Sequence, residues 1–240
     1  MPLPSRDVKA STSNELSPVI LNAIEQSLQE IYKIELPLSV EDFLIDRHTL
    51  ESVLERGNCR IAHRQADGFL LISEGSDDLY LAVYLDDRII SNLTRNDPRN
   101  SLNSDNLADF CTATEEISHF AYTAWNALQS KPVTPLELEL QAEVDKFVTC
   151  YFFLSGHRDR NLLPGLKTQL FEEFTLDEQL AAEQRARYLT ASQYAGRYCH
   201  HLEQAYVQVG SPAAMIRDLR RFYRMGMEGK FIHIQRSLLQ

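Results

Sequence analysis

The sequence predicts an α+β fold that is mostly helical, in which a small three-stranded antiparallel meander packs against a helical core. Three observations support this class. Apolar residues recur at helical spacing before residue 59 and again after residue 106. Between these regions, short apolar segments alternate with turn signals, as in paired strands. The 240 residues, 44% hydrophobic and 24% charged, can build a buried core and are not typical of a disordered or collagenous chain.

The N-terminal part predicts a disordered tail followed by helices. Residues 1 to 16 contain two prolines and no apolar period, so we expect a tail there. Ser17 and Pro18 are typical of an N-cap and a first helical position, and they open an amphipathic helix at about 18 to 33. A second, shorter helix is expected over 47 to 56.

Three strands are expected near 59 to 65, 69 to 74 and 79 to 85. Turn signals separate them, namely Ala-Asp-Gly ending at Gly68 and Gly-Ser-Asp-Asp beginning at Gly75. Because the connections are so short, neighbouring strands must pair antiparallel. A meander of this size needs cover on one face, which the helices would provide.

The rest of the chain predicts helices and a division into two regions. The expected helices cover about 106 to 129, 135 to 154, 176 to 208 and 212 to 225. Proline and glycine residues mark their ends. We therefore expect a core over 17 to 155 and a helical C-terminal region over 156 to 240 that packs on it.

Charge and cysteine usage narrow the class of protein. The net charge of −10 argues against binding nucleic acid through the whole surface. No window approaches the run of about 18 apolar residues that a membrane span needs, and the first twenty residues lack the apolar stretch of a signal peptide, so a cytoplasmic protein is expected. Cys59, Cys111, Cys150 and Cys199 lie too far apart in sequence for a zinc knuckle or a redox dithiol, and we expect them reduced and buried.

A Glu-Glu-Ile-Ser-His string in the helix at 106 to 129 carries the chemistry that the sequence suggests. It begins at Glu115 and ends at His119. Residues four apart project from one face of a helix, so these two side chains could hold one metal ion. An antiparallel helical hairpin would bring Glu143, on the next helix, beside His119 as a third ligand.

At this point the chain resembles the zincin-like metallopeptidases of the ImmA/IrrE type, over about residues 59 to 155. The shared features are a meander, a helix with an HExxH-like string, and a following helix with a glutamate. The resemblance implies that His119 and Glu143 bind zinc and that Glu116 is the general base that activates water. Glu115 stands where the family has its first histidine, so the motif is degenerate.

This departure from the family motif argues for altered or lost chemistry. Two carboxylates and one imidazole hold zinc less selectively than two imidazoles and one carboxylate, and they also suit Mn²⁺ or Fe²⁺. A further negative ligand would make bound water less acidic, which opposes hydrolysis. The preferred hypothesis is a non-catalytic partner-binding or regulatory protein. The alternatives are a metal-dependent peptidase or related hydrolase with a Glu/His/Glu site, and a helical scaffold without metal.

Two further interpretations of the same helices stay open. On a helical wheel, Glu115 and His119 fall opposite the apolar stripe, where an ordinary solvated Glu-His pair would also lie. His200 and Glu203 could combine with Glu116 and His119 into a di-iron carboxylate site, although their order is reversed from the usual motif.

A basic amphipathic stretch near the C-terminal end suggests a protein partner. Its arginines alternate with apolar residues and could dock on an acidic surface, which the chain's own acidic body could also provide. A solvated helix face and a nucleic-acid contact are the alternatives, and nucleic acid is not expected. The four residues assigned to partner binding are Arg217, Arg220, Arg221 and Arg224.

Overall fold

The computed structural model describes the core and most of the helical C-terminal region. The described residues are 17–56, 60–64, 67–74, 79–156, 165–171 and 181–238. The predicted N-terminal tail, the start of the predicted helix at 176 to 208, and Cys59 lie outside them.

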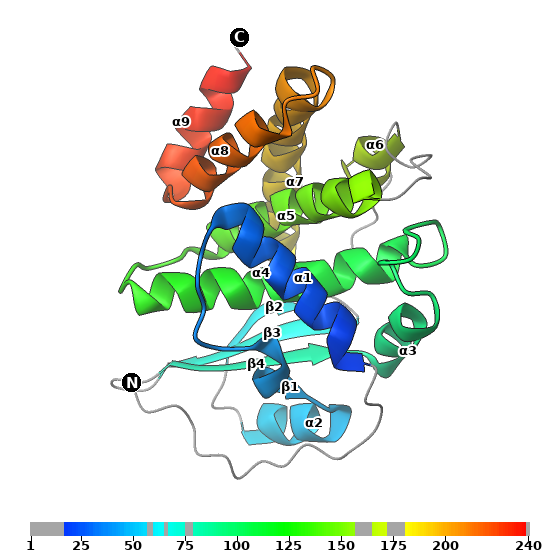
Figure 1. The fold of residues 1–240 in the computed structure, drawn as a ribbon. Coiled ribbons are helices and arrows are strands. Elements are labelled where there is room, and N and C mark those ends of the chain that lie inside the picture. The colour runs from blue at the N-terminus through cyan, green and yellow to red at the C-terminus, as the bar shows by residue number, and fades with distance from the viewer. Residues whose placement is uncertain are drawn as a thin grey trace.

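Helices dominate the architecture, and the prediction of a mostly helical α+β protein is confirmed (Figure 1). The helices are α1 (Ser17–Tyr32), α2 (Arg47–Arg56), α3 (Asp87–Arg95), α4 (Leu107–Leu128), α5 (Pro135–Gly156), α6 (Leu166–Phe171), α7 (Ala182–Leu202), α8 (Pro212–Tyr223) and α9 (Met227–Ser237). Two shorter helical segments are η1 (Val40–Phe43), a 3₁₀ turn, and η3 (Glu203–Val207), a π-helical turn. The strands are β1 (Leu44–Ile45), β2 (Arg60–Arg64), β3 (Gly68–Glu74) and β4 (Leu79–Leu85).

The sheet is mixed, which corrects the expectation of a simple antiparallel meander. Its strand order is β1-β4-β3-β2. β2 pairs antiparallel with β3, and β3 pairs antiparallel with β4. β1 joins the other side of β4 in parallel, with Leu44 opposite Val83. A two-residue strand is too short to show an alternating pattern in the sequence.

Helices cover both faces of the sheet, whereas the sequence suggested cover on one face. Side chains alternate along β3 and β4, because successive residues of a strand point to opposite faces. One set packs into the main core with α4, and comprises Leu70, Ile72, Val83 and Leu85. The other set forms a small second cluster with Leu50 of α2, and comprises Phe69, Leu71 and Tyr84. Figure 1 shows α2 and α4 on opposite sides of the sheet.

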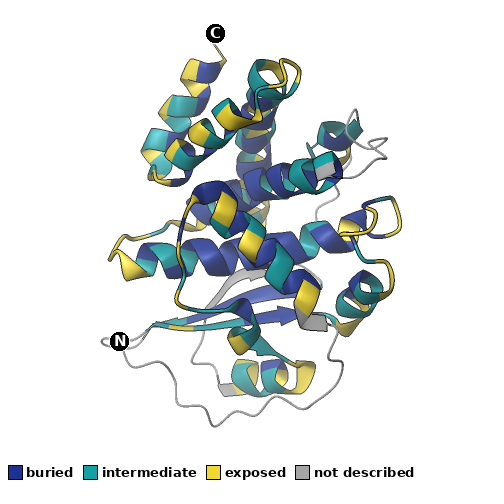
Figure 2. Ribbon diagram, in the orientation of Figure 1, coloured by how far each residue is buried: buried dark blue, intermediate teal, exposed yellow. Residues whose placement is uncertain are grey.

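The helices stack in layers above the sheet. α4 runs along the sheet, α5 lies on α4, and α7 crosses α5, while α8 and α9 lie at the end of the molecule away from α2 (Figure 1). Buried residues concentrate in the sheet, α4 and α5 (Figure 2). Among the described helices, none combines the length and the apolar character that crossing a bilayer requires.

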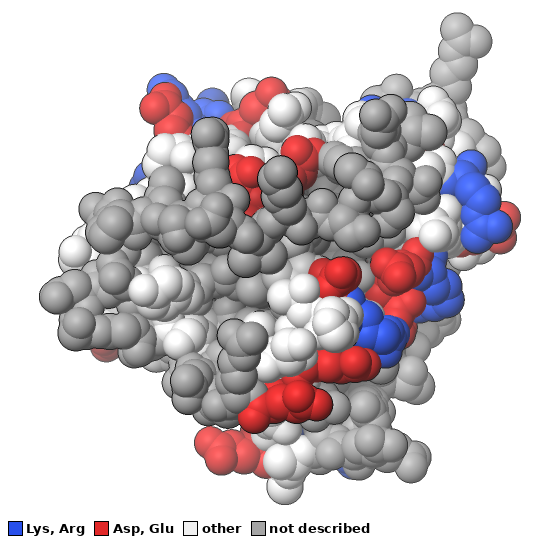
Figure 3. Space-filling model, turned by 90° about the horizontal axis from the view of Figure 1, so that it is seen from below, with Lys and Arg blue, Asp and Glu red and all other residues white. Residues whose placement is uncertain are grey.

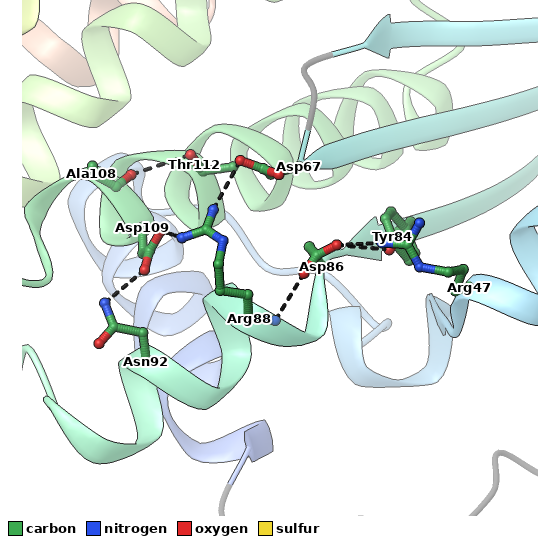
Figure 4. A network of polar contacts seen from close by, with 9 residues as sticks. All are labelled: Arg47, Asp67, Tyr84, Asp86, Arg88, Asn92, Ala108, Asp109 and Thr112. Carbon is green, nitrogen blue, oxygen red and sulfur yellow. Dashed lines mark hydrogen bonds and ion pairs between the residues drawn. The ribbon is translucent and has the colours of Figure 1, made fainter.

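A polar network fixes the start of α4 against α3. The Arg88 guanidinium donates to Asp109 Oδ1 at 3.0 Å and to Asp67 Oδ2 at 2.9 Å (Figure 4). Asn92 Nδ2 donates to Asp109 Oδ2 at 2.7 Å. The network therefore holds the N-terminal end of the helix that carries the Glu-Glu-Ile-Ser-His string.

On the surface seen from below, acidic and basic side chains lie close together (Figure 3).

Two arginines of the basic stretch are bound to the end of α1. Arg220 donates to the carbonyls of Ile31 at 2.9 Å and Glu30 at 3.0 Å. Arg224 donates to the carbonyls of Tyr32 at 3.0 Å and Lys33 at 3.1 Å. The last carbonyls of a helix lack partners within the helix and carry partial negative charge, so cations stabilise them. The structure thus gives Arg220 and Arg224 intramolecular partners.

Candidate metal centre

The Glu-Glu-Ile-Ser-His string lies on α4, where this helix faces α5. Cys111 Sγ lies 3.8 Å from Cys150 Sγ at one end of the pair, and the Tyr122 hydroxyl donates to Glu137 Oε1 at 2.5 Å at the other. Contacts that run in opposite order along two helices define an antiparallel hairpin, joined by the short connection after α4. The side chains that face each other across this hairpin form the centre.

Three buried side chains converge there: Glu115 and His119 from α4 and Glu139 from α5. Their potential ligand atoms all lie within 4.8 Å of one another. Ligands held about 2.0 to 2.2 Å from one ion lie roughly 3 to 4 Å apart, so small side-chain movements would let this group close on a metal. The group is therefore compatible with metal binding.

The third member of the group is Glu139, one helical turn before the Glu143 that the sequence predicted. Among the described residues, the group that could hold an ion does not include Glu143. Glu143 Oε1 instead lies 3.0 Å from Lys146 Nζ. One turn of helix corresponds to a shift of about 5.4 Å along α5, and the sequence does not fix the register of a hairpin to that degree.

The His119 ring lies between two carboxylates. Its Nε2 atom is 3.5 Å from Glu139 Oε2, and its Nδ1 atom is 3.7 Å from Glu116 Oε2. Burial opposes the charged form of this imidazole, but the two carboxylates outweigh it and raise the pKa of His119 to about 10. Glu116, the predicted general base, therefore faces Nδ1 of the ring, whereas Glu139 faces Nε2.

Gly68 at the start of β3 leaves the space that Glu116 occupies. A Cβ atom at this position would lie 2.8 Å from Glu116 Cγ and 2.9 Å from Glu116 Oε1, which is closer than van der Waals contact allows. The glycine that signalled a turn in the sequence thus also admits a buried carboxylate of α4.

Two cations, Lys146 and Arg187, contact the carboxylates of the candidate group. Lys146 Nζ is 2.9 Å from Glu115 Oε2 and 3.0 Å from Glu143 Oε1. Burial lowers the pKa of Lys146, but these two carboxylates more than compensate and raise it. Arg187 of α7 places its Nε atom 3.3 Å from Glu139 Oε1. Each of the two carboxylates in the candidate group is therefore held by a cation.

The ion pairs of the described centre join four carboxylates to Lys146 and Arg187, namely Glu115, Glu116, Glu139 and Glu143. With a pKa of about 10, His119 carries a further positive charge near neutral pH. A metal ion at this centre would take the place of the proton on His119, because only the neutral imidazole binds a metal.

The interpretation of Glu115 and His119 as a solvated pair is wrong. Glu115 is 2% exposed and His119 is 0% exposed. The helical wheel suggested a solvent face because α4 carries polar residues opposite its apolar stripe. In the fold, the sheet, α1 and α5 surround α4, so its polar face is buried too.

A second polar cluster lies beside the centre and joins α9 to the hairpin. Lys230 Nζ donates to Gln141 Oε1 at 2.8 Å and to the Tyr122 hydroxyl at 3.0 Å. Asp145 accepts hydrogen bonds from Gln141 Nε2 at 2.8 Å and from the Ser118 hydroxyl at 2.6 Å. Burial lowers the pKa of Lys230 to about 7 and raises that of Asp145 to about 6.

The residues of the proposed di-iron motif lie elsewhere. His200 is exposed, and its Nδ1 atom is 3.2 Å from Lys167 Nζ. Within the described part of the chain, the group that could hold a metal contains neither His200 nor Glu203.

Comparisons of the chain with protein-family models, with curated protein sequences and with solved structures found no match. A functional assignment therefore depends on the chemistry of the centre.

Proposed function

We propose that the protein is a non-catalytic, zincin-like protein that holds one divalent metal ion at Glu115, His119 and Glu139. The observation that carries this proposal is the convergence of three buried side chains whose potential ligand atoms lie within 4.8 Å of one another. Buried ionisable groups are costly unless opposite charge balances them. A divalent ion would take the place of the proton on His119 and add to the positive charges of Lys146 and Arg187.

The donor set favours Mn²⁺ or Fe²⁺ over Zn²⁺. Two carboxylates and one imidazole are harder ligands than the two imidazoles and one carboxylate of the related peptidases. When bound, such an ion would hold the α4–α5 hairpin together and could polarise a coordinated oxygen.

Neighbouring charged residues contact the proposed ligands without binding the metal themselves. Lys146 holds Glu115 and Arg187 holds Glu139, each through one carboxylate oxygen. Glu116 faces His119 Nδ1, the arrangement in which a carboxylate orients a metal-binding imidazole through its other nitrogen. This role for Glu116 replaces that of general base in the proposal.

Burial supports a structural or regulatory role rather than hydrolysis. Glu116 and His119 are each 0% exposed, so a peptide substrate cannot reach them without opening of the hairpin. The alternative, a metal-dependent hydrolase that uses Glu116 as base, requires such an opening. Peptidase assays of the metal-loaded protein distinguish the two, because the proposal predicts no turnover that depends on Glu116.

Elemental analysis of purified protein, incubated with Mn²⁺, Fe²⁺ or Zn²⁺ and then dialysed, tests the metal site. We expect Glu139→Gln to lose most of the bound metal. The matched variant Glu143→Gln, one turn away on the same helix, should retain it. Equal metal content in the two variants, or none in the wild type, would contradict the proposed ligand set.

A further inference from the structure

A second candidate site lies at the far end of the molecule from α2, between η3, α8 and α9. A hollow of about 510 Å³ opens there. Its size falls within the range of small-molecule pockets, which is about 300 to 1,000 Å³. Its lining includes two arginines, two histidines, a tyrosine and one carboxylate, namely Arg221, Arg236, His201, His233, Tyr206 and Asp218.

The only carboxylate among these lining residues already has two side-chain partners. Asp218 Oδ1 lies 2.9 Å from His233 Nε2, and Asp218 Oδ2 accepts a hydrogen bond of 3.4 Å from the Tyr206 hydroxyl. These contacts come from three different segments, η3, α8 and α9. Asp218 therefore positions His233 and Tyr206 at the hollow.

The two guanidinium groups of the hollow remain available. Among the described residues, neither Arg221 nor Arg236 forms an ion pair or a side-chain hydrogen bond. Their neighbours Arg220 and Arg224 are instead bound to the C-terminal end of α1. Of the four arginines assigned to the basic stretch, Arg220 and Arg224 thus hold α1 and Arg217 is exposed, while Arg221 lines the hollow together with Arg236.

The π-helical turn η3 places Tyr206 at the rim. Gln208 N donates to the Glu203 carbonyl at 3.0 Å, which is the five-residue spacing of a π-helix. Such turns are rare and are frequently found at functional sites. The ring of Tyr206 also packs edge-on against His201, with 5.7 Å between ring centroids. A widened turn at the junction of α7 and α8 therefore brings a phenol and an imidazole to the same hollow.

We propose that this hollow binds a small molecule that carries a phosphate group. Guanidinium groups recognise phosphate through paired, charge-assisted hydrogen bonds. Arg221 and Arg236 provide two such groups from neighbouring helices. The site is separate from the proposed metal centre and does not depend on it.

Calorimetric titration tests this site with three probes: inorganic phosphate, adenosine monophosphate and succinate. We expect saturable binding of at least one phosphate probe with a Kd below about 1 mM. Arg221→Gln combined with Arg236→Gln should weaken that binding by roughly tenfold or more. The control is Arg95→Gln with Arg99→Gln, which removes the same charge from the region of α3 and should leave the affinity unchanged.

Thermal melts provide an independent readout of the same interaction. A saturating phosphate probe should raise the Tm of the wild type and of the control variant but not that of the Arg221/Arg236 variant, because a ligand stabilises only a protein that binds it. Three results would overturn the proposal. These are no saturable binding of either phosphate probe, equal weakening in both double variants, or tighter binding of succinate than of both phosphate probes.

Discussion

Lys146 Nζ lies 2.9 Å from Glu115 Oε2, so a largely buried ammonium group neutralises the carboxylate that stands where the HExxH motif has its first histidine. The same ammonium contacts Glu143 at 3.0 Å. Glu115, the residue that departs from the motif, is thus paired with a cation of α5. Substitutions around this pair test how the centre is held together.

Replacing Lys146 by Met should destabilise the fold. The variant leaves the buried Glu115 and the largely buried Glu143 without their shared cation, and breaking a buried ion pair costs about 3 kcal/mol or more. Urea unfolding measures this loss. Lys131→Met removes an exposed lysine within the hairpin connection and should change the free energy of unfolding by less than about 1 kcal/mol. Equal effects of the two substitutions would contradict the role of Lys146.

Gly68→Ala should disturb Glu116 directly. The new methyl group would meet Glu116 Cγ at 2.8 Å, and such overpacking costs about 1 to 3 kcal/mol. Glu116→Ala in the same chain should relieve most of this clash, so the double variant is expected to lose less than the sum of the two single changes. Gly165→Ala is the control, since nothing lies within 4 Å of a Cβ there. Additive effects at residues 68 and 116 would contradict the contact.

The buried amine of Lys230 should make stability depend on pH. Its pKa of about 7 in the fold lies below the value of 10.5 in an unfolded chain. Between these values the amine binds more protons in the unfolded state, so its own contribution to the free energy of unfolding should rise as pH increases from 7 toward 10, by up to about 1.4 kcal/mol per pH unit. His119, whose pKa is raised to about 10 in the fold, contributes in the opposite direction over the same range. Tyr122 and Gln141 contact this amine, and Glu137 and Asp145 also face it, with charges that oppose the lowering of its pKa.

Lys230→Met should remove this contribution, so the free energy of unfolding of the variant should fall more steeply with pH than that of the wild type. Chemical unfolding at several pH values between 7 and 10 measures the slope for both proteins. An equally steep slope in the variant would show that another group is responsible.

Arg220→Gln combined with Arg224→Gln should lower the Tm. These side chains donate four hydrogen bonds to the carbonyls at the end of α1, and because both guanidinium groups lie at the surface, each bond contributes only about 0.5 kcal/mol. A total loss of about 2 kcal/mol corresponds to several degrees for a chain of this length. Arg217→Gln on the exposed side of α8 should leave the Tm nearly unchanged. Were the double variant as stable as the wild type, the two arginines would be free to serve a partner, as the sequence first suggested.

Local periodicity predicted much of the fold. Helical spacing identified α1, α2, α4, α5 and α8, and turn signals located β3 and β4. β1 was missed because two residues carry no pattern. α3 was missed because its start depends on Asp86, whose carboxylate accepts from the Arg88 amide at 2.9 Å, inside a stretch of polar residues. α9 was missed because it is rich in polar residues and one of its buried residues, Lys230, is itself charged, so no clear apolar stripe marks the side that carries Lys230 and Ile234.

The candidate centre was predicted only in part. The spacing of four residues placed Glu115 and His119 on one face of α4, and the hairpin brought a carboxylate of α5 to them. Which carboxylate it is depends on the register of two helices, and that register is set by contacts spread along the hairpin. The contribution of Arg187 depends on how α7 crosses α5, and the spacing of residues along the chain carries no signal for it.

The most direct test of the metal centre is a titration of chelator-treated protein with Mn²⁺, in which electron paramagnetic resonance follows the free ion. The account predicts one tightly bound ion per chain in the wild type and in Glu143→Gln. It predicts that this site is lost in Glu139→Gln and in Glu115→Gln. A wild type that leaves all the added Mn²⁺ free, or a Glu139→Gln variant that still binds one ion as tightly, would contradict it.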